Sequence, residues 1–180
     1  MTATGAVVWF TGLSGAGKTT IGTALAHRLA SAGRPALLLD GDELRRGLCS
    51  DLGFSLADRA ENMRRAAHAA ILVGQTGAVA IVALISPEAS ARQRVRELVT
   101  AAQLPFLEVY ASTPLAECER RDPKGLYRRA RAGELADFTG IHQPYEPPAR
   151  PELVLAPSED IDVAVARIIQ ALPAMLARRD

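Results

Sequence analysis

The chain has 180 residues, 48% of them hydrophobic, which predicts one domain over residues 1–180 because domains commonly contain about 100–200 residues. Its net charge of +1 argues against a partner such as nucleic acid or an anionic membrane, since binding either one needs a basic excess. No apolar run reaches the ~20 residues that cross a bilayer, and no basic segment precedes the first apolar run as in a secretory signal, so we expect a cytoplasmic protein.

Short apolar runs alternate with longer helical patterns along the chain. Strands are expected at residues 7–11, 36–39, 79–85, 106–110 and 152–155. Helices are expected at residues 19–32, 58–76, 92–102, 114–121 and 161–177. Strands that are apolar throughout are typical of burial on both faces, and long crossovers between strands indicate a parallel sheet. The prediction is a three-layer α/β fold with a parallel sheet of about five strands between helices.

Residues 122–150 interrupt this alternation. The segment is rich in Gly, Pro and basic residues, among them Arg128, Arg129 and Arg131. We expect it to be a mobile lid inserted into the same domain. Closure of such a lid would keep water away from a reacting phosphoryl group and bring positive charge to it. The alternative is a solvated basic helix whose arginines have no role in the chemistry.

Residues 12–19 match the phosphate-binding pattern G-x-x-x-x-G-K-[ST] between a predicted strand and a predicted helix. In such a loop the backbone N–H groups point at phosphate oxygens, and the helix N-terminus adds partial positive charge. Lys18 would supply an ammonium to the β- and γ-phosphates, and Thr19 a hydroxyl to Mg²⁺. The expected ATP-binding residues are Gly12, Leu13, Ser14, Gly15, Ala16, Gly17, Lys18, Thr19 and Thr20.

Two aspartates follow the second predicted strand, in the sequence Asp40-Gly41-Asp42. They lie at the strand's carboxyl end, the edge where parallel sheets bind ligands. Either carboxylate could accept the proton of an acceptor hydroxyl or hold Mg²⁺ through water, and we favour Asp42 as the base. The alternative is that an aspartate caps the helix that follows. The short chain has no N-K-x-D guanine motif, which favours a small kinase over a GTPase.

A second cluster has the chemistry of a site for a planar anion. Arg59 and Asn62 are three residues apart and share a helix face, and Arg45 and Phe54 precede them. An Arg fork binds phosphate or sulfate oxygens, Asn adds hydrogen bonds, and an aromatic ring stacks on a base. Taken alone, Arg59 would be interpreted as a solvated surface charge; the cluster favours a ligand site.

The motifs, taken in order, resemble those of the adenylyl-sulfate kinase family of P-loop kinases. The matching stretches are GLSGAGKTT (12–20), LDGDELRRGLCSDLGFSLADRAENMRR (39–65), ISP (85–87), EVYASTPLAECERRDPKGLYRRARAGELADFTG (108–140), PYEPP (144–148) and PELVL (151–155). The resemblance implies transfer of the γ-phosphoryl of ATP, with Mg²⁺, to the 3′-hydroxyl of adenosine 5′-phosphosulfate. The products would be 3′-phosphoadenylyl sulfate and ADP, in sulfate activation. The resemblance is also compatible with a homodimer and with a functional link to an ATP sulfurylase.

The same resemblance implies roles for individual residues. The catalytic residues would be Lys18, Asp42 and Ser86. Ser86 matches a family serine described as a phosphoserine intermediate, although direct transfer needs only positioning and charge neutralisation. Residues that would bind the nucleotide substrate are Asp40, Asp42, Arg45, Phe54, Arg59, Asn62, Ile85, Ser86, Lys124 and Phe138.

Two further observations bear on this interpretation. Lys18 and Lys124 are the only lysines among 21 basic residues, and both fall in motifs expected to touch phosphate or sulfate, where Lys and Arg are not interchangeable. The chain departs from the family pattern at His68, Glu88 and His142. Two alternatives stay open: another small-metabolite kinase that shares the phosphate loop, and a non-catalytic nucleotide-binding module.

Overall fold

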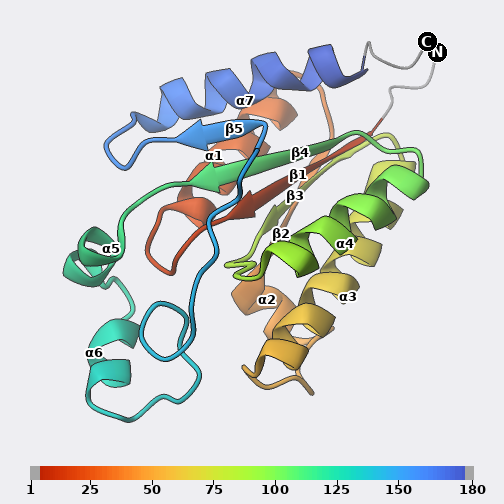
Figure 1. Ribbon diagram of the computed structural model, residues 1–180. Coiled ribbons are helices and arrows are strands. Elements are labelled where there is room, and N and C mark those ends of the chain that lie inside the picture. Colours follow the sequence, from red (N-terminus) through yellow and green to blue (C-terminus); the bar gives the residue numbers. More distant parts are fainter. Residues whose placement is uncertain (1–4, 177–180) are drawn as a thin grey trace.

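The computed structural model describes residues 5–176, and within them one parallel sheet has the strand order β2-β3-β1-β4-β5 (Figure 1). The strands are β1 (Ala6–Thr11), β2 (Ala36–Asp40), β3 (Val79–Ala83), β4 (Phe106–Ala111) and β5 (Leu153–Leu155). The helices are α1 (Lys18–Ser31), α2 (Gly41–Arg46), α3 (Leu56–Gln75), α4 (Ala89–Ala101), α5 (Leu115–Arg121), α6 (Leu126–Arg131) and α7 (Ile161–Leu176).

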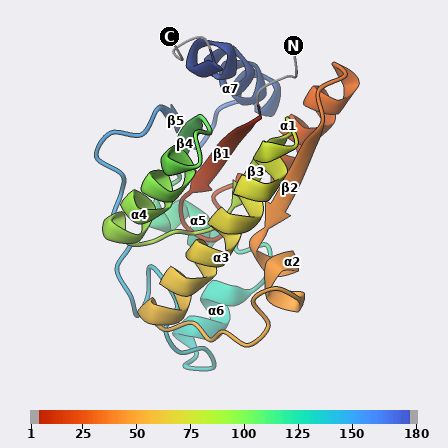
Figure 2. The same ribbon diagram turned by 90° about the vertical axis from the view of Figure 1, so that its right-hand side faces the viewer.

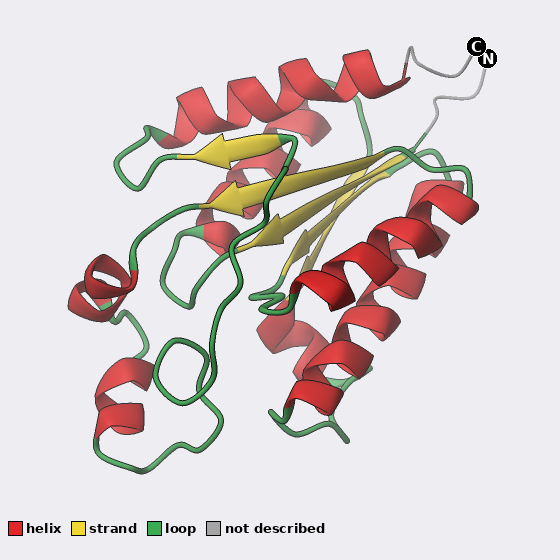
Figure 3. Cartoon of the chain, viewed as in Figure 1, coloured by secondary structure: helices red, strands yellow, loops and turns green. Residues whose placement is uncertain are grey.

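Helices cover both faces of the sheet, with α1 and α7 on one face and α3 and α4 on the other (Figures 2 and 3). The apolar sequence of β1 before Thr11 explains this arrangement, because its side chains alternate between two cores. Val7 and Trp9 lie in the core that contains α3 and α4 residues. Val8 and Phe10 lie in the core formed with α1 and α7. The predicted three-layer α/β fold is confirmed, while the predicted domain limits at residues 1 and 180 fall outside the described residues and stay a prediction.

The predicted elements are all present, with changed ends and two additions. The third strand was predicted to reach Ile85, but β3 ends at Ala83. The chain then turns, and Ser86 adopts a left-handed backbone conformation with φ of 50°. Helices α2 and α6 were not among the predicted elements, although the alternatives for Asp40-Gly41-Asp42 and for the basic part of the lid assume a helix. Each has only six residues, and such a segment is too short to show a helical repeat. The predicted end of the last helix, residue 177, lies outside the described residues.

The predicted lid, residues 122–150, packs beside the phosphate loop (Figure 1). Tyr127 and Phe138 meet edge to face with ring centroids 5.0 Å apart, and both belong to a small third core that includes Leu13 and Ala16 of the phosphate loop. The Tyr127 hydroxyl donates to the carbonyl oxygen of Ser14 at 2.9 Å. Lid and phosphate loop are therefore in direct contact, and the mobility of the lid stays a prediction.

No helix within residues 5–176 is both long enough and apolar enough to span a bilayer.

Candidate active site

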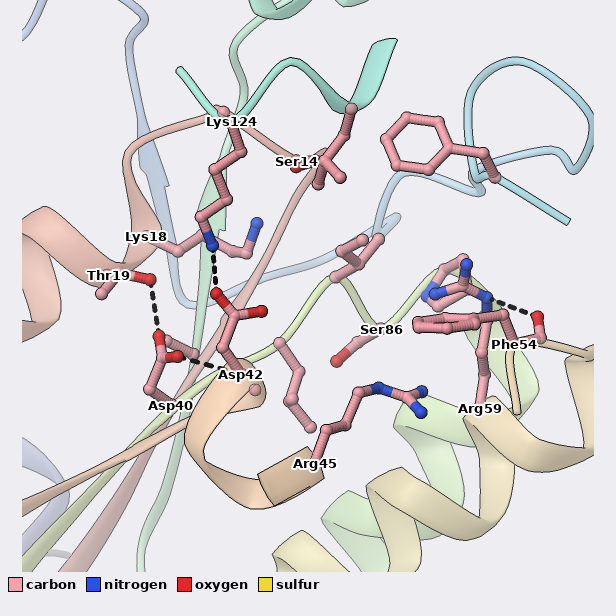
Figure 4. A pocket seen from close by; sticks show the side chains of 18 of the residues that line it. Ser14, Lys18, Thr19, Asp40, Asp42, Arg45, Phe54, Arg59, Ser86 and Lys124 are labelled. Carbon is pink, nitrogen blue, oxygen red and sulfur yellow. Dashed lines mark hydrogen bonds and ion pairs between the residues drawn. The ribbon is translucent and has the colours of Figure 1, made fainter. Parts of the chain in front are cut away.

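A cavity of about 750 Å³ opens at the carboxyl edge of the sheet. The parallel register brings the ends of β1, β2 and β3 to this edge, and the start of α3 and the lid complete the walls (Figure 4). Most of the predicted site residues line it, namely Ser14, Gly15, Gly17, Lys18, Thr19, Thr20, Asp40, Asp42, Arg45, Phe54, Arg59, Asn62, Ile85, Ser86, Lys124 and Phe138. The predicted residues Gly12, Leu13 and Ala16 are buried behind the cavity wall instead.

The phosphate loop requires glycine at its first position. Gly12 has φ of 143°, and a Cβ there would approach the carbonyl oxygen of Ala111 to 2.6 Å. A side chain would therefore both strain the backbone and clash with β4. With Gly12 in this conformation, the later loop residues Ser14, Gly15 and Gly17 line the cavity.

Lys18 is turned back onto its own loop (Figure 4). Its Nζ donates to the carbonyl oxygens of Gly12 at 2.8 Å and Leu13 at 2.7 Å. The residue is only 8% exposed, and burial lowers the pKa of its ammonium from 10.5 to about 8 because a low-dielectric surrounding disfavours the charged form. An anion bound in the loop would raise this pKa again, because a nearby negative charge favours the ammonium.

Thr19 and Asp40 meet where α1 begins and β2 ends. The Thr19 hydroxyl donates to Asp40 Oδ2 at 2.7 Å, and Asp40 Oδ1 accepts from the backbone N–H of Asp42 at 2.9 Å. Asp40 is thus the N-cap of α2, as the alternative interpretation proposed, and it also lines the cavity. Hydroxyl and carboxylate oxygens are the donors that Mg²⁺ prefers, so this pair fits the ion that accompanies ATP.

Asp42 forms an ion pair with Lys124 of the lid (Figure 4). Both side chains are largely exposed, so the pair contributes little to stability. The position of the ion pair is more informative than its strength, because the pair joins the segment after β2 to the lid across the mouth of the cavity.

The predicted ligand cluster assembles at the other end of the cavity. The Arg45 guanidinium lies 4.3 Å from the centroid of the Phe54 ring, and its Nη1 donates to the carbonyl oxygens of Leu52 and Gly53. The Asn62 side chain is buried and lines the cavity. Its amide also lies beside the buried Cys49 thiol, to which it acts as a hydrogen-bond donor.

Arg59 is 8% exposed, so the interpretation of this residue as a solvated surface charge is wrong. Its Nε donates to the carbonyl oxygen of Phe54 at 3.0 Å and to Gln143 Oε1 at 3.1 Å, and its Nη2 donates to the carbonyl oxygen of Asp137 at 2.9 Å. Burial lowers the pKa of its guanidinium to about 10. Arg59 therefore ties the ligand cluster to the lid.

Comparison with known proteins decides between the interpretations left open by the sequence. Residues 4–156 match the family model described as adenylylsulphate kinase. The chain belongs to the adenylylsulphate kinase family. An adenylyl-sulfate kinase of Shewanella amazonensis is 52% identical over 169 residues, which cover 93% of this chain and 84% of the relative.

Solved structures of adenylylsulphate kinases share the fold. The Mycobacterium tuberculosis APS kinase CysC, in complex with AMPPNP and APS, has a TM-score of 0.92 and 49% identity, covering 94% of this chain and 98% of that one. A hexameric APS kinase from Thiobacillus denitrificans has a TM-score of 0.71 and 35% identity, covering 96% of this chain and 29% of that one. The resemblance stated from the motifs is confirmed.

The three departures from the adenylylsulphate kinase pattern lie outside the cavity lining. His68 is exposed on α3. Glu88 is the residue that precedes α4, and its side chain makes no capping hydrogen bond. His142 lies in a lid turn, where its Nδ1 accepts from the backbone N–H of Phe138 at 3.3 Å.

Several residues of this kinase site were not predicted. The additional lining residues include Met63, Pro87, Pro123, Leu135 and Asp137. All five fall inside the motif stretches quoted above, so membership in a motif was a signal that could have identified them. Behind the cavity, Trp9 and Arg92 hold Ser86, and nothing in the local sequence of either residue indicated this contact.

Proposed function

We propose that this adenylyl-sulfate kinase transfers the γ-phosphoryl of ATP to the 3′-hydroxyl of adenosine 5′-phosphosulfate in one direct displacement. The bond from the 3′-oxygen to the γ-phosphorus forms as the bond from that phosphorus to the β,γ-bridging oxygen breaks, and the hydroxyl proton leaves to a protein base. The observation that carries this is the shared cavity, with the phosphate loop at one end and the Phe54 cluster at the other. Positioning and charge neutralisation are what such a transfer needs.

On the ATP side, we assign the phosphates to the loop from Gly12 to Thr20. Lys18 would leave the carbonyls of Gly12 and Leu13 and turn to the β- and γ-phosphates. Their negative charge would keep its ammonium fully protonated. Thr19 would hold Mg²⁺ directly, and Asp40 would do so through water. The bound ion would neutralise charge that develops on the phosphate oxygens.

On the acceptor side, we assign Asp42 as the base for the 3′-hydroxyl proton. Its pairing with Lys124 implies an exchange of partners, in which the ammonium moves to the phosphates or sulfate and frees the carboxylate. Lid closure would accompany this exchange. Phe54 would stack on the adenine, while Arg45, Arg59 and Asn62 hold the anionic part and Ile85, Ser86 and Phe138 complete the site.

The test is ADP release from Mg-ATP with and without low micromolar adenosine 5′-phosphosulfate, with the product identified by mass. We expect ADP release that depends on the acceptor and a product heavier by one phosphate. No stimulation, with ATP still bound, would contradict the proposal. Stimulation by a different metabolite would favour the other small-metabolite kinase, and binding without any turnover would favour the non-catalytic module.

Asp42→Asn tests the base. Because the amide cannot accept the proton, kcat should fall by about 10²–10⁴, while the Kd for ATP stays within about twofold. Glu43→Gln is the matched control, since Glu43 is the neighbouring acid on α2 and pairs with Arg46 on the surface. Equal effects of the two substitutions would remove Asp42 from the role of base.

Assembly and location belong to the same proposal. Association of two copies is supported by the hexameric relative, and light scattering on the purified protein would measure it. A functional link to an ATP sulfurylase and a cytoplasmic location stay predictions.

A further inference from the structure

Trp9 makes a buried hydrogen bond into the active site. It lies on β1, is 0% exposed, and packs on Phe106 with ring centroids 6.3 Å apart. Its indole Nε1 donates to Ser86 Oγ at 2.9 Å. An indole N–H is a donor only, so the Ser86 oxygen must be the acceptor in this bond. The hydroxyl hydrogen of Ser86 is therefore directed to a different acceptor.

The backbone of Ser86 is held as firmly as its side chain. Its φ of 50° is a left-handed conformation that costs a non-glycine residue energy and persists only where the surroundings enforce it. Arg92 Nη1 donates to its carbonyl oxygen at 2.7 Å, and the Thr11 hydroxyl lies against the same turn, 2.8 Å from the carbonyl oxygen of Ile85 and 3.2 Å from that of Ser86. The residue is 2% exposed and still lines the cavity. Figure 4 shows its side chain in the same cavity as Asp42 and Phe54.

We propose that Trp9 is a positioning residue for the reaction: its indole N–H orients the Ser86 hydroxyl so that the hydroxyl hydrogen is donated to an oxygen or nitrogen acceptor of the bound adenylyl sulfate. The inference rests on the proposed function, in which Ser86 contacts that substrate. It makes Ser86 a hydrogen-bond donor to the acceptor substrate. A serine oxygen already engaged by an indole hydrogen is also a poorer nucleophile, which agrees with direct transfer.

Trp9→Phe removes the N–H and keeps an aromatic ring against Phe106. We expect the Kd and KM for adenosine 5′-phosphosulfate to rise about three- to tenfold, the usual effect of one hydrogen bond, with the Kd for ATP within twofold of the original. Phe106→Leu is the matched control, because it disturbs the same packing without touching the hydrogen bond. It should lower stability and leave the Kd for adenosine 5′-phosphosulfate within twofold.

A double-mutant cycle with Ser86→Ala separates positioning from packing. In the Ser86→Ala background, Trp9→Phe should weaken binding of adenosine 5′-phosphosulfate by less than twofold, because the hydroxyl it orients is gone. The two substitutions should also be less than additive in stability, since Ser86→Ala leaves the Trp9 N–H buried without an acceptor and Trp9→Phe removes that N–H. Equal weakening in both backgrounds, or an unchanged Kd in Trp9→Phe, would overturn the inference.

A second measurement does not depend on Trp9→Phe folding. Trp9 is the only tryptophan of the chain, so the fluorescence of the otherwise intact protein reports on this bond. Ser86→Ala should shift the emission maximum, and adenosine 5′-phosphosulfate should change the emission of the original protein more than that of Ser86→Ala. Identical spectra and identical responses would overturn the inference. An original protein without acceptor-dependent ADP release would overturn the proposed function, and this inference with it.

Discussion

Lysine is used in this chain only where a compact, adaptable charge faces the nucleotide cavity. Lys18 and Lys124 are the two lysines among 21 basic residues, and both line the cavity. Unlike a guanidinium, an ammonium changes its protonation readily when it is buried. Lys18 shows this, because burial lowers its pKa to about 8. The protonation of Lys18 can therefore respond to a bound anion, whereas a guanidinium at this position would stay charged.

The protonation of Lys18 predicts a pH dependence of ATP binding. In the free protein its ammonium is lost as the pH rises through about 8, whereas bound phosphates raise its pKa. Binding of ATP at pH 9 should therefore take up close to one proton, and the Kd should weaken by up to about tenfold between pH 7.5 and pH 9. Calorimetry in buffers of different ionisation enthalpy measures the uptake.

Lys18→Arg is the control for that measurement. A guanidinium stays charged in this range, so its ATP affinity should be weaker but nearly independent of pH. The free protein gives a second check, because the unfolded chain binds more protons than the folded one between about pH 8 and the ordinary lysine value of 10.5. The contribution of Lys18 to the free energy of unfolding should then rise with pH over that interval. The difference between the original protein and Lys18→Arg isolates it from the buried Cys and Tyr groups, whose raised pKa values act in the opposite direction. Absence of proton uptake at pH 9 would contradict the assignment of Lys18 to the phosphates.

At the scale of elements, Arg59 connects the start of α3 with the lid. Its guanidinium donates to Phe54 on one side and to Asp137 and Gln143 of the lid on the other. The Gln143 amide in turn donates to the carbonyl oxygen of Phe54 at 3.2 Å. The ring proposed to stack on adenine is therefore placed by contacts with the segment proposed to close.

Arg59→Met should loosen the lid. Removing these donors leaves three oxygens with fewer partners, and we expect the free energy of unfolding to fall by about 1–3 kcal/mol. The lid should then be cut faster at exposed Glu134 by a protease specific for Glu, and the KM for adenosine 5′-phosphosulfate should rise. Arg46→Met, at an exposed position on α2, should leave both unchanged. Equal cleavage rates in the two variants would show that Arg59 does not hold the lid.

At the scale of the whole molecule, Arg92 joins the turn at Ser86 to β4 and to the end of the lid. From α4 it donates to the carbonyl oxygens of Ser86 and Glu146, both at 2.7 Å, and pairs with Glu108 of β4 at 3.1 Å. Glu146 Oε2 also accepts from the backbone N–H of Ala89 at 2.7 Å, at the start of α4. The chain returning from the lid is thus anchored to the turn that carries Ser86.

Arg92→Leu should be strongly destabilising. It removes one of the two arginines that pair with the buried Glu108 carboxylate, the other being Arg96, and it leaves two carbonyl oxygens with fewer partners. A buried charge left without any partner costs about 3–5 kcal/mol, so the loss should approach that value without exceeding it. Urea unfolding measures the change. Arg94→Leu, an exposed position on the same helix, should cost far less. Combining Arg92→Leu with Glu108→Leu should recover part of the loss, and no recovery would show that the carboxylate is not the source of the cost.

The local chemistry of the site was predictable from the chain. Gly12 to Thr19, Asp40 and Asp42, and the Phe54 cluster are short motifs whose residues act within a few positions of one another. The strands were predictable for the same reason, since β1 is apolar at every position before Thr11 and is buried on both faces. Helices α2 and α6 were not among the predicted elements, because six residues are too few to show a helical repeat. The end of β3 was predicted too late, because apolar residues continue past the last residue that pairs with a neighbouring strand.

Sequence patterns were sufficient for the three-layer fold, the phosphate loop and the class of ligand, because these depend on composition and spacing within one segment. Only the tertiary structure decided that Arg59 is buried, that Asp42 meets Lys124, and that Trp9 and Arg92 hold Ser86. The contacts of Ser86 with Trp9 and of Asp42 with Lys124 span 77 and 82 positions. The burial of a side chain and the identity of its partner depend on segments brought together by the sheet, and no local pattern encodes them.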